Sequence, residues 1–183
     1  KILDYKKTKK YPGIALIPVD KKGNNQIYVL PGINEDFRAK DIDDSQVLFE
    51  NAKNNNGLLA LSLELPLSTA IYALKIAKKY KLKSIVDPGG IIKGVDYSKL
   101  LNEDIFLIKP NEHEVKILTG VSVVGFTSAK KAAKVFFKKG IQYVLITAGR
   151  KGAYFFGQNH EEHIKIPKVK TSNKRDETGC GDQ

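Results

Sequence analysis

The sequence predicts an α/β protein in which a mostly parallel sheet is covered by helices on both faces. From about Asp41 onward, short and continuous apolar runs alternate with segments whose apolar residues recur at helical spacing. Continuous apolar strands in such an alternation are typical of a parallel sheet that is buried on both faces. The 183 residues, of which 42% are hydrophobic, suffice for one domain of ordinary size with a sizeable core.

Two predicted strands precede this alternation. Residues 13–19 and 26–30 are apolar runs, and the polar segment 20–25 between them favours a hairpin loop. We therefore divide the chain into a region of strands, residues 1–36, and an α/β core, residues 37–183.

The elements of the α/β core follow from the same patterns. Four short apolar runs read as buried strands, at residues 57–63, 84–87, 105–108 and 142–147. Helices are predicted over residues 43–52, from Pro66 through Ala77, after Pro110, and over residues 128–139. Residues 153–156 and 162–166 are expected to form an antiparallel pair at an edge of the sheet.

The chain is strongly basic. It has 31 Lys and Arg residues against 20 Asp and Glu residues, which gives a formal net charge of +11. The lysines are spread over predicted helix faces and helix ends, and no aromatic residues alternate with them in a base-stacking pattern. We therefore favour solvated faces over a nucleic-acid-binding surface, although a positive field would also attract a nucleotide or a sugar phosphate.

Several classes of protein are disfavoured by the sequence. It contains no apolar run near the roughly 20 residues that a membrane span requires, and no secretory signal opens the chain. Cys180 is the only cysteine, which excludes an internal disulfide and a cysteine-based metal site. We expect a cytoplasmic protein without a membrane or nucleic-acid partner.

Polar residues and glycines gather directly after the predicted strands. Ligands of open parallel sheets bind at the carboxyl ends of the strands. This rule selects Glu64, Asp87, the segment 109–114 and the segment 147–152 as candidates for a binding site.

The segment Lys109-Pro110-Asn111-Glu112-His113-Glu114 combines a cation with an amide and an acid. Lys109 can bind phosphate as a point charge. Asn111 and Glu114 share the first turn of a helix, and an acid beside phosphates is reasonable when it acts through Mg²⁺ or the waters of Mg²⁺. The same pair also fits a capping box with Asn111 as the N-cap, and this alternative is favoured when the motif is considered alone.

The segment Thr147-Ala148-Gly149-Arg150-Lys151-Gly152 has a hydroxyl, two glycines and two cations, which suit the binding of phosphate or ribose. A turn that merely connects two strands is the alternative, and it too is favoured for the motif in isolation.

The end of the sequence combines a glycine-rich turn with an acid. In Gly179-Cys180-Gly181, backbone N–H groups can converge on an anion at the start of a helix. The carboxylate of Asp182 follows at once, and it has a role if it accepts a proton from a hydroxyl that attacks a phosphoryl group. The alternative is a surface turn with a solvated aspartate.

Taken together, these motifs resemble the ribokinase-like (PfkB-type) carbohydrate kinases. Asp176–Asp182 is similar to the late signature of that family, Asn111–Glu114 to its Asn-x-x-Glu motif, and Thr147–Gly149 to its Thr-x-Gly nucleotide loop. Residues 58–78 are similar to the family's strand and helix with its substrate-side Glu, and residues 13–20 with 31–34 are similar to the segment where a lid strand returns to the sheet.

The resemblance implies a three-layer α/β/α fold and the ATP-dependent phosphorylation of a sugar hydroxyl, of ribose or a related sugar. It makes Asp182 the general base and gives the anion hole to the N–H groups of Gly179, Cys180 and Gly181. It implies that Asn111 and Glu114 position Mg²⁺-ATP, with Glu114 acting through water.

Further roles follow from the same resemblance. Lys109 would contact the phosphates, and Thr147, Gly149 and Gly152 would line the nucleotide site. Glu64 would contact the sugar, and Asp87 is a weaker candidate on the substrate side. Glu177 departs from the family pattern, because it adds a negative charge beside the expected anion hole.

Other readings stay open. They are a nucleoside or sugar-phosphate kinase of the same family and, in another class, a non-catalytic regulator that binds a nucleotide or sugar. The family also suggests a homodimer through lid strands and a monovalent cation. The family's first strand is not found before Lys1, and its helix after the base would follow Gln183. We therefore expect a longer protein, and we expect these residues alone to be poorly stable and inactive.

Overall fold

The computed structural model describes residues 11–21 and 25–166. These residues form two compact units, residues 11–37 and 38–166, and each unit is considered by itself. No helix within the described residues is long and apolar enough to cross a membrane.

The small unit is a two-stranded antiparallel ribbon followed by a short helix. Strand β1 (Ile14–Leu16) pairs with β2 (Tyr28–Leu30), so that Ile14 lies opposite Leu30. The 3-10 helix η1 (Gly32–Asp36) follows directly. Both predicted strands are confirmed, although they are shorter than predicted, and all their side chains are exposed because the ribbon has no covered face within its own unit.

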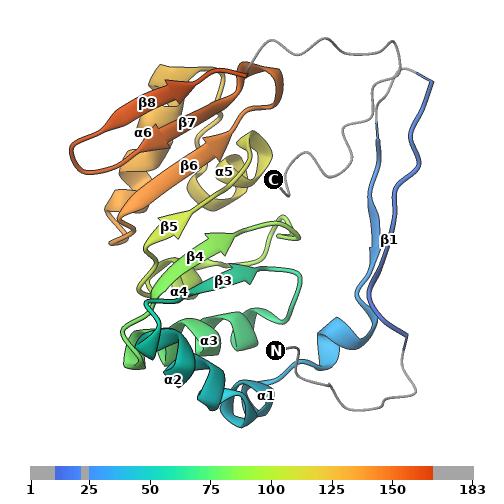
Figure 1. The fold of residues 1–183 in the computed structure, drawn as a ribbon. Coiled ribbons are helices and arrows are strands. Elements are labelled where there is room, and N and C mark those ends of the chain that lie inside the picture. The colour runs from blue at the N-terminus through green and yellow to red at the C-terminus, as the bar shows by residue number, and fades with distance from the viewer. Residues whose placement is uncertain (1–10, 22–24, 167–183) are drawn as a thin grey trace. The chain divides into compact units, whose positions relative to one another are not determined.

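The large unit is built on a six-stranded sheet in the order β3-β4-β5-β6-β7-β8. Figure 1 shows these strands in chain order, from β3 at the bottom of the sheet to β8 at the top. Their bounds are Leu58–Ser62, Lys83–Asp87, Leu107–Ile108, Tyr143–Thr147, Ala153–Phe156 and Glu161–Ile164. Strands β3 to β6 are parallel, and β7 and β8 are antiparallel to their neighbours, which confirms the mostly parallel sheet and its antiparallel edge pair.

The helices of the large unit are α1 (Ala39–Asp44), α2 (Gln46–Asn54), α3 (Leu67–Lys79), α4 (Ser98–Leu101), α5 (Glu112–Thr119) and α6 (Phe126–Phe137). The helix predicted over residues 43–52 is confirmed for residues 46–52, which lie in α2, but it is interrupted at Ser45, which ends α1 and begins α2. The Ser45 hydroxyl donates a hydrogen bond to the carbonyl oxygen of Asp41 at 2.8 Å. Serine competes in this way with the backbone bonds that would continue a helix.

One face of the sheet forms the core. The register places Leu61, Val86, Ile108, Val144 and Phe156 in one row across five strands, and each of them is buried. They belong to a single apolar cluster to which four helices also contribute, through Ala70, Leu74, Leu100, Val115 and Phe136 among others. This packing holds the helices against the sheet.

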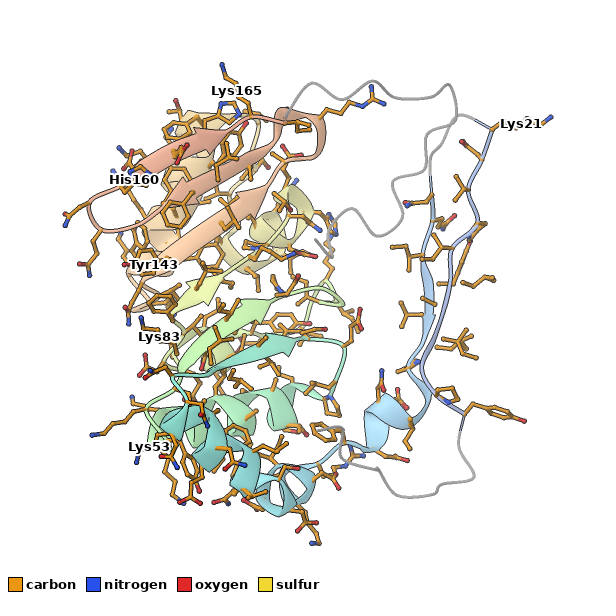
Figure 2. All side chains as sticks on the ribbon, in the orientation of Figure 1. Lys21, Lys53, Lys83, Tyr143, His160 and Lys165 are labelled. Carbon is orange, nitrogen blue, oxygen red and sulfur yellow. The ribbon has the colours of Figure 1, made fainter. Side chains whose placement is uncertain are left out.

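The opposite face of the sheet is only partly covered within the described residues. The rings of Phe106 and Tyr143 lie 4.8 Å apart, and those of Tyr143 and Phe155 are stacked at 5.9 Å. The Lys83 ammonium lies 4.5 Å from the centre of the Phe106 ring. Figure 2 shows Lys83, Tyr143 and His160 at the end of the sheet where the parallel strands begin. The amino ends of the parallel strands therefore carry aromatic and basic side chains, and the carboxyl ends lie at the opposite end of the sheet.

Candidate active site

The carboxyl ends of the four parallel strands lie at one end of the sheet. Glu64 follows β3, Asp87 ends β4, Lys109 follows β5 and Thr147 ends β6. Residues predicted from four separate stretches of sequence therefore gather at one edge. Three of these stretches are also joined by direct contacts.

Asp87 and Lys109 form an ion pair across neighbouring strands. The Lys109 Nζ lies 2.8 Å from Asp87 Oδ2, and the side chains are 23% and 40% exposed, respectively. The second oxygen, Asp87 Oδ1, accepts a hydrogen bond from the Gly89 N–H at 3.0 Å. One oxygen of the Asp87 carboxylate therefore stabilises the turn that follows β4, and the other binds the Lys109 ammonium. The sequence selected both residues but gave no sign of their pairing.

Asn111 and Glu114 form a closed ring of hydrogen bonds at the start of α5. The Asn111 N–H donates to Glu114 Oε2 at 2.8 Å, and the Asn111 Nδ2 donates to Glu114 Oε1 at 2.8 Å. In return, the Glu114 N–H donates to Asn111 Oδ1 at 2.9 Å. The capping box that the sequence allowed is therefore formed. Each carboxylate oxygen of Glu114 accepts one of these bonds, which leaves lone pairs available for a water or a cation.

Burial raises the pKa of Glu114 above its ordinary value, because a charged carboxylate loses solvation in a half-buried site. The hydrogen bond from the Asn111 N–H opposes this effect, since it stabilises the charged form. The nearby charge of Asp87 also raises the pKa, and that of Lys109 lowers it. Asp87, Lys109 and Glu114 are therefore close enough to influence one another electrostatically.

The loop after β6 is attached to the start of α5. The Thr147 N–H donates to the carbonyl oxygen of Pro110 at 3.0 Å, and Asn111 and Thr147 form a parallel bridge. The Lys151 Nζ lies 3.0 Å from Glu112 Oε1. Sequence reasoning missed this ion pair because its members belong to different motifs. These contacts bring the predicted amide–acid pair and the predicted nucleotide loop together.

The two glycines of this loop differ in their surroundings. Gly149 has a positive φ of 49°, and a Cβ there would meet open space. Gly152 has a positive φ of 88°, and a Cβ there would collide with the carbonyl oxygen of Ile164 on β8. The backbone therefore requires glycine at position 152 whether or not a ligand binds, while Gly149 leaves space on its surface.

Glu64 lies beside the turn that follows β4. A Cβ on Gly90, whose φ is 84°, would lie 3.2 Å from the Glu64 Cγ. The Leu63 N–H donates to the carbonyl oxygen of Asp87 at 3.2 Å, which joins the two strand ends. The turn at residues 88–90 thus separates Glu64 from Lys109 along this edge of the sheet.

The predicted general base and anion hole, Asp182 with Gly179, Cys180 and Gly181, lie outside the described residues. Among the residues that are described, no group of three or more His, Cys, Asp or Glu side chains is placed to hold a metal. The oxygen atoms of Asn111 and Glu114 still suit Mg²⁺, which prefers oxygen ligands and retains several of its waters.

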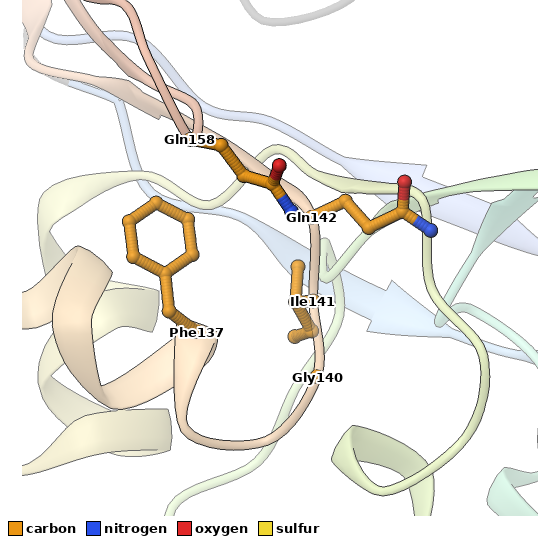
Figure 3. A pocket seen from close by; sticks show the side chains of 5 residues that line it. All are labelled: Phe137, Gly140, Ile141, Gln142 and Gln158. Atoms are coloured by element: carbon orange, nitrogen blue, oxygen red, sulfur yellow. The ribbon is translucent and has the colours of Figure 1, made fainter.

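A pocket of about 210 Å³ lies elsewhere, where α6 ends and β6 begins. Figure 3 shows the residues that line it: Phe137, Gly140, Ile141, Gln142 and Gln158. None of them is ionisable, and the residues that lead into β6 lie at the amino end of that strand. The pocket is therefore unrelated to the polar cluster at the carboxyl ends.

A parallel sheet whose carboxyl ends carry an ammonium, an amide–acid pair and a glycine-containing loop is suited to binding phosphates. Comparison with known proteins defines the class further. The model of the pfkB family of carbohydrate kinases matches residues 4–183, and the chain belongs to this family.

Curated relatives agree with this assignment. The chain is 35% identical over 170 residues to the ribokinase of Staphylococcus aureus and 31% identical over 170 residues to the deoxyribokinase of Salmonella typhi. Each alignment covers 93% of this chain and 53% of the relative. The chain therefore spans about half the length of these relatives.

Solved structures confirm the predicted ribokinase-like fold. The ribokinase of Arabidopsis thaliana, complexed with ribose and ATP, superposes with a TM-score of 0.74 at 28% identity. That match covers 95% of this chain and 54% of the other. The ribokinase of Thermotoga maritima superposes with a TM-score of 0.69 at 29% identity and covers 93% of this chain and 52% of that one.

Proposed function

We propose that the natural protein transfers the γ-phosphoryl group of ATP to a hydroxyl of ribose or a related sugar. One observation carries the proposal: in a chain of this family, Lys109, Asn111, Glu114 and Thr147 lie together at the carboxyl end of a parallel sheet. The ribokinase and deoxyribokinase relatives support a sugar as the acceptor.

The reaction requires one bond to form and one to break. The oxygen of the sugar hydroxyl attacks the γ-phosphorus and forms the new O–P bond. The bond from that phosphorus to the β,γ-bridging oxygen breaks, and ADP leaves. In this proposal Asp182 accepts the proton of the hydroxyl, and the N–H groups of Gly179, Cys180 and Gly181 stabilise the charge on the transferring group.

The described residues would bind and orient the reactants. The Lys109 ammonium would contact the phosphates, and Glu64 would contact the sugar. The loop that contains Thr147, Gly149 and Gly152 would line the nucleotide site, since its contacts with Pro110 and Glu112 hold it beside the start of α5. Gly149 would lie against the nucleotide, because a Cβ at this position would meet no atom of the described residues within 4 Å.

Mg²⁺ belongs to this proposal as the partner of ATP. Glu114 would hold it through a water, with Asn111 orienting the carboxylate through the hydrogen bonds of the capping box. When bound, the ion neutralises charge on the phosphates and aligns them. The described residues contribute few direct ligands, so the phosphates would supply the others.

Asp182→Asn in the full-length protein tests the proposed chemistry. Loss of a general base lowers turnover by about 10²- to 10⁴-fold, while the affinity for ATP should stay near that of the unchanged protein. The assay compares ribose, 2-deoxyribose, a sugar phosphate and a nucleoside, each with and without K⁺ to test a monovalent cation. Unchanged turnover would reject Asp182 as the base. Tight sugar binding without any phosphoryl transfer would instead support a regulator.

The location and assembly of the protein are also proposals. A reaction that consumes ATP fits the cytoplasm. The exposed apolar side chains of β1 and β2, among them Leu16 and Tyr28, suit pairing with the same strands of a second copy. A homodimer that dissociates in a Leu16→Asp variant would support this assembly, and a wild-type protein that is monomeric at high concentration would refute it.

A further inference from the structure

The ion pair between Asp87 and Lys109 is more firmly built than an ordinary surface ion pair. Asp87 Oδ1 is engaged by the Gly89 N–H, and Pro88 between them is fully buried. The hydrogen bond within the turn therefore restricts the orientation of the Asp87 carboxylate independently of its contact with Lys109. On the other side, the Lys109 N–H donates to the carbonyl oxygen of Val86 at 2.9 Å, so both backbones are held by the sheet.

A second ion pair of the large unit, between Lys130 and Glu161, allows the exposure of the Asp87–Lys109 pair to be compared with that of a more exposed pair. The Lys130 Nζ lies 2.7 Å from Glu161 Oε2, and these side chains are 43% and 38% exposed, respectively. The side chains of Asp87 and Glu161 are similarly exposed, at 40% and 38%, but the Lys109 side chain, at 23%, is much less exposed than that of Lys130, at 43%. Solvent screens a charge less when the charge is partly buried, so Asp87 constrains Lys109 more strongly than Glu161 constrains Lys130.

We propose that Asp87 is a positioning residue, which holds the Lys109 ammonium where the phosphates of the nucleotide arrive and shares it with them once they bind. This inference rests on the proposed function. A lysine side chain is flexible, and a free one would lose its freedom at the moment of the reaction. An ammonium that is already placed avoids that loss when the phosphoryl group moves.

The negative charge of the Asp87 carboxylate should also weaken the binding of the anionic nucleotide. Asp87 and Glu114 both carry carboxylates, and both lie near Lys109, so the edge attracts an anionic ligand less than the ammonium alone would. Removing the Asp87 charge should therefore strengthen the binding of ATP in its ground state. It should also slow the reaction, because the ammonium is no longer held in place. These two effects have opposite signs, which a general loss of structure would not produce.

The test uses Asp87→Asn in the full-length protein, since an amide oxygen still accepts the hydrogen bond from Gly89. We expect kcat to fall about 10- to 100-fold, because small misplacements of a reacting group have effects of that size. We expect the Kd and KM for ATP to fall about three- to tenfold, because one negative charge has gone. The matched control Glu161→Gln removes the carboxylate of the other ion pair and should leave all three constants unchanged.

A double-mutant cycle separates positioning from a structural role. If Asp87 acts through Lys109, then Asp87→Asn should change kcat by less than about twofold in a Lys109→Met background. An equal loss in both backgrounds, an unchanged kcat, or a weaker affinity for ATP would overturn the proposal. If Asp87→Asn does not fold, Asp87→Ser carries the same expectations, because a serine hydroxyl also accepts the hydrogen bond of the turn.

The outcomes also distinguish this inference from the proposed function. If the unchanged protein phosphorylates no sugar, the proposed function fails, and the titration with ATP alone still decides whether the Asp87 charge opposes nucleotide binding. If the unchanged protein is active and Asp87→Asn behaves like Glu161→Gln, only the positioning role fails.

Discussion

Helices α5 and α6 both begin with a side chain that reaches back to the backbone, but they use different chemistry. At α6, the Ser128 Oγ accepts hydrogen bonds from the Val124 and Gly125 N–H groups at 2.9 and 3.1 Å. At α5, the charged and half-buried Glu114 does the equivalent work, together with Asn111. A neutral hydroxyl is therefore sufficient to start a helix in this protein.

The difference teaches that the charge at α5 serves more than the helix. Burial raises the pKa of Glu114, which shows that the site disfavours the charged form. A residue that only capped the helix would not need this charge. The charge lies near Lys109 and Asp87, at the edge where we propose that the phosphates of ATP bind, so we attribute it to the proposed handling of Mg²⁺-ATP.

Among the tests of this comparison between the two helices, the largest expected effect is that of Glu114→Gln on activity. Glutamine has the same shape and can still accept a hydrogen bond from the Asn111 N–H, but it carries no charge for a magnesium-bound water. In the full-length protein, kcat/KM should fall about 100-fold, the size of effect seen when one electrostatic contact to the reacting group is removed. The assay is run over a range of Mg²⁺ concentrations. Wild-type activity in this variant would mean that the charge of Glu114 has no catalytic role. Glu114 would then only cap α5, as Ser128 caps α6.

The next effect is that of Ser128→Ala on stability. Loss of a capping side chain lowers the free energy of unfolding by about 1 kcal/mol. Urea denaturation of the full-length protein measures this change, and kcat/KM should stay at the wild-type value. A large loss of activity would show that the start of α6 also contributes to the site, and the two helices would then not differ in this respect.

The smallest effect is the pH dependence that Glu114 contributes. Because the pKa of Glu114 is raised in the folded state, the folded protein binds this proton more tightly than the unfolded chain does. The contribution of Glu114 to stability is therefore fully present below the unfolded pKa, and it is lost as pH rises through the folded pKa. Stability is compared between the wild type and Glu114→Gln across the acidic range above about pH 4.3. The wild type should lose stability relative to the variant as pH rises, and a difference that does not change with pH would contradict the raised pKa.

Much of the fold could be predicted because it depends on local patterns. The apolar run 57–63 contains β3, and Asn111 with Glu114 marks the start of α5. The break at Ser45 was missed because a single hydroxyl interrupts an otherwise helical pattern. The four-residue helix α4 was also missed, since it is too short to show a period.

The candidate site divides in the same way. Lys109, Asn111, Glu114 and Thr147 were selected because they follow predicted strands, and the structure brings them together at one edge of the sheet. The pairing of Asp87 with Lys109 and of Glu112 with Lys151 joins residues of different strands and loops. No local pattern encodes such contacts.

The sequence by itself determined the class of fold, the order of most of its elements and the candidate residues for the chemistry, because apolar periodicity and short motifs are local properties. Only the tertiary structure decided which of these residues touch, which oxygen of Asp87 meets Lys109, and why Gly152 must be glycine. Those contacts depend on the register of the strands and on chain segments that meet only after the sheet has formed. They therefore cannot be predicted from local sequence patterns.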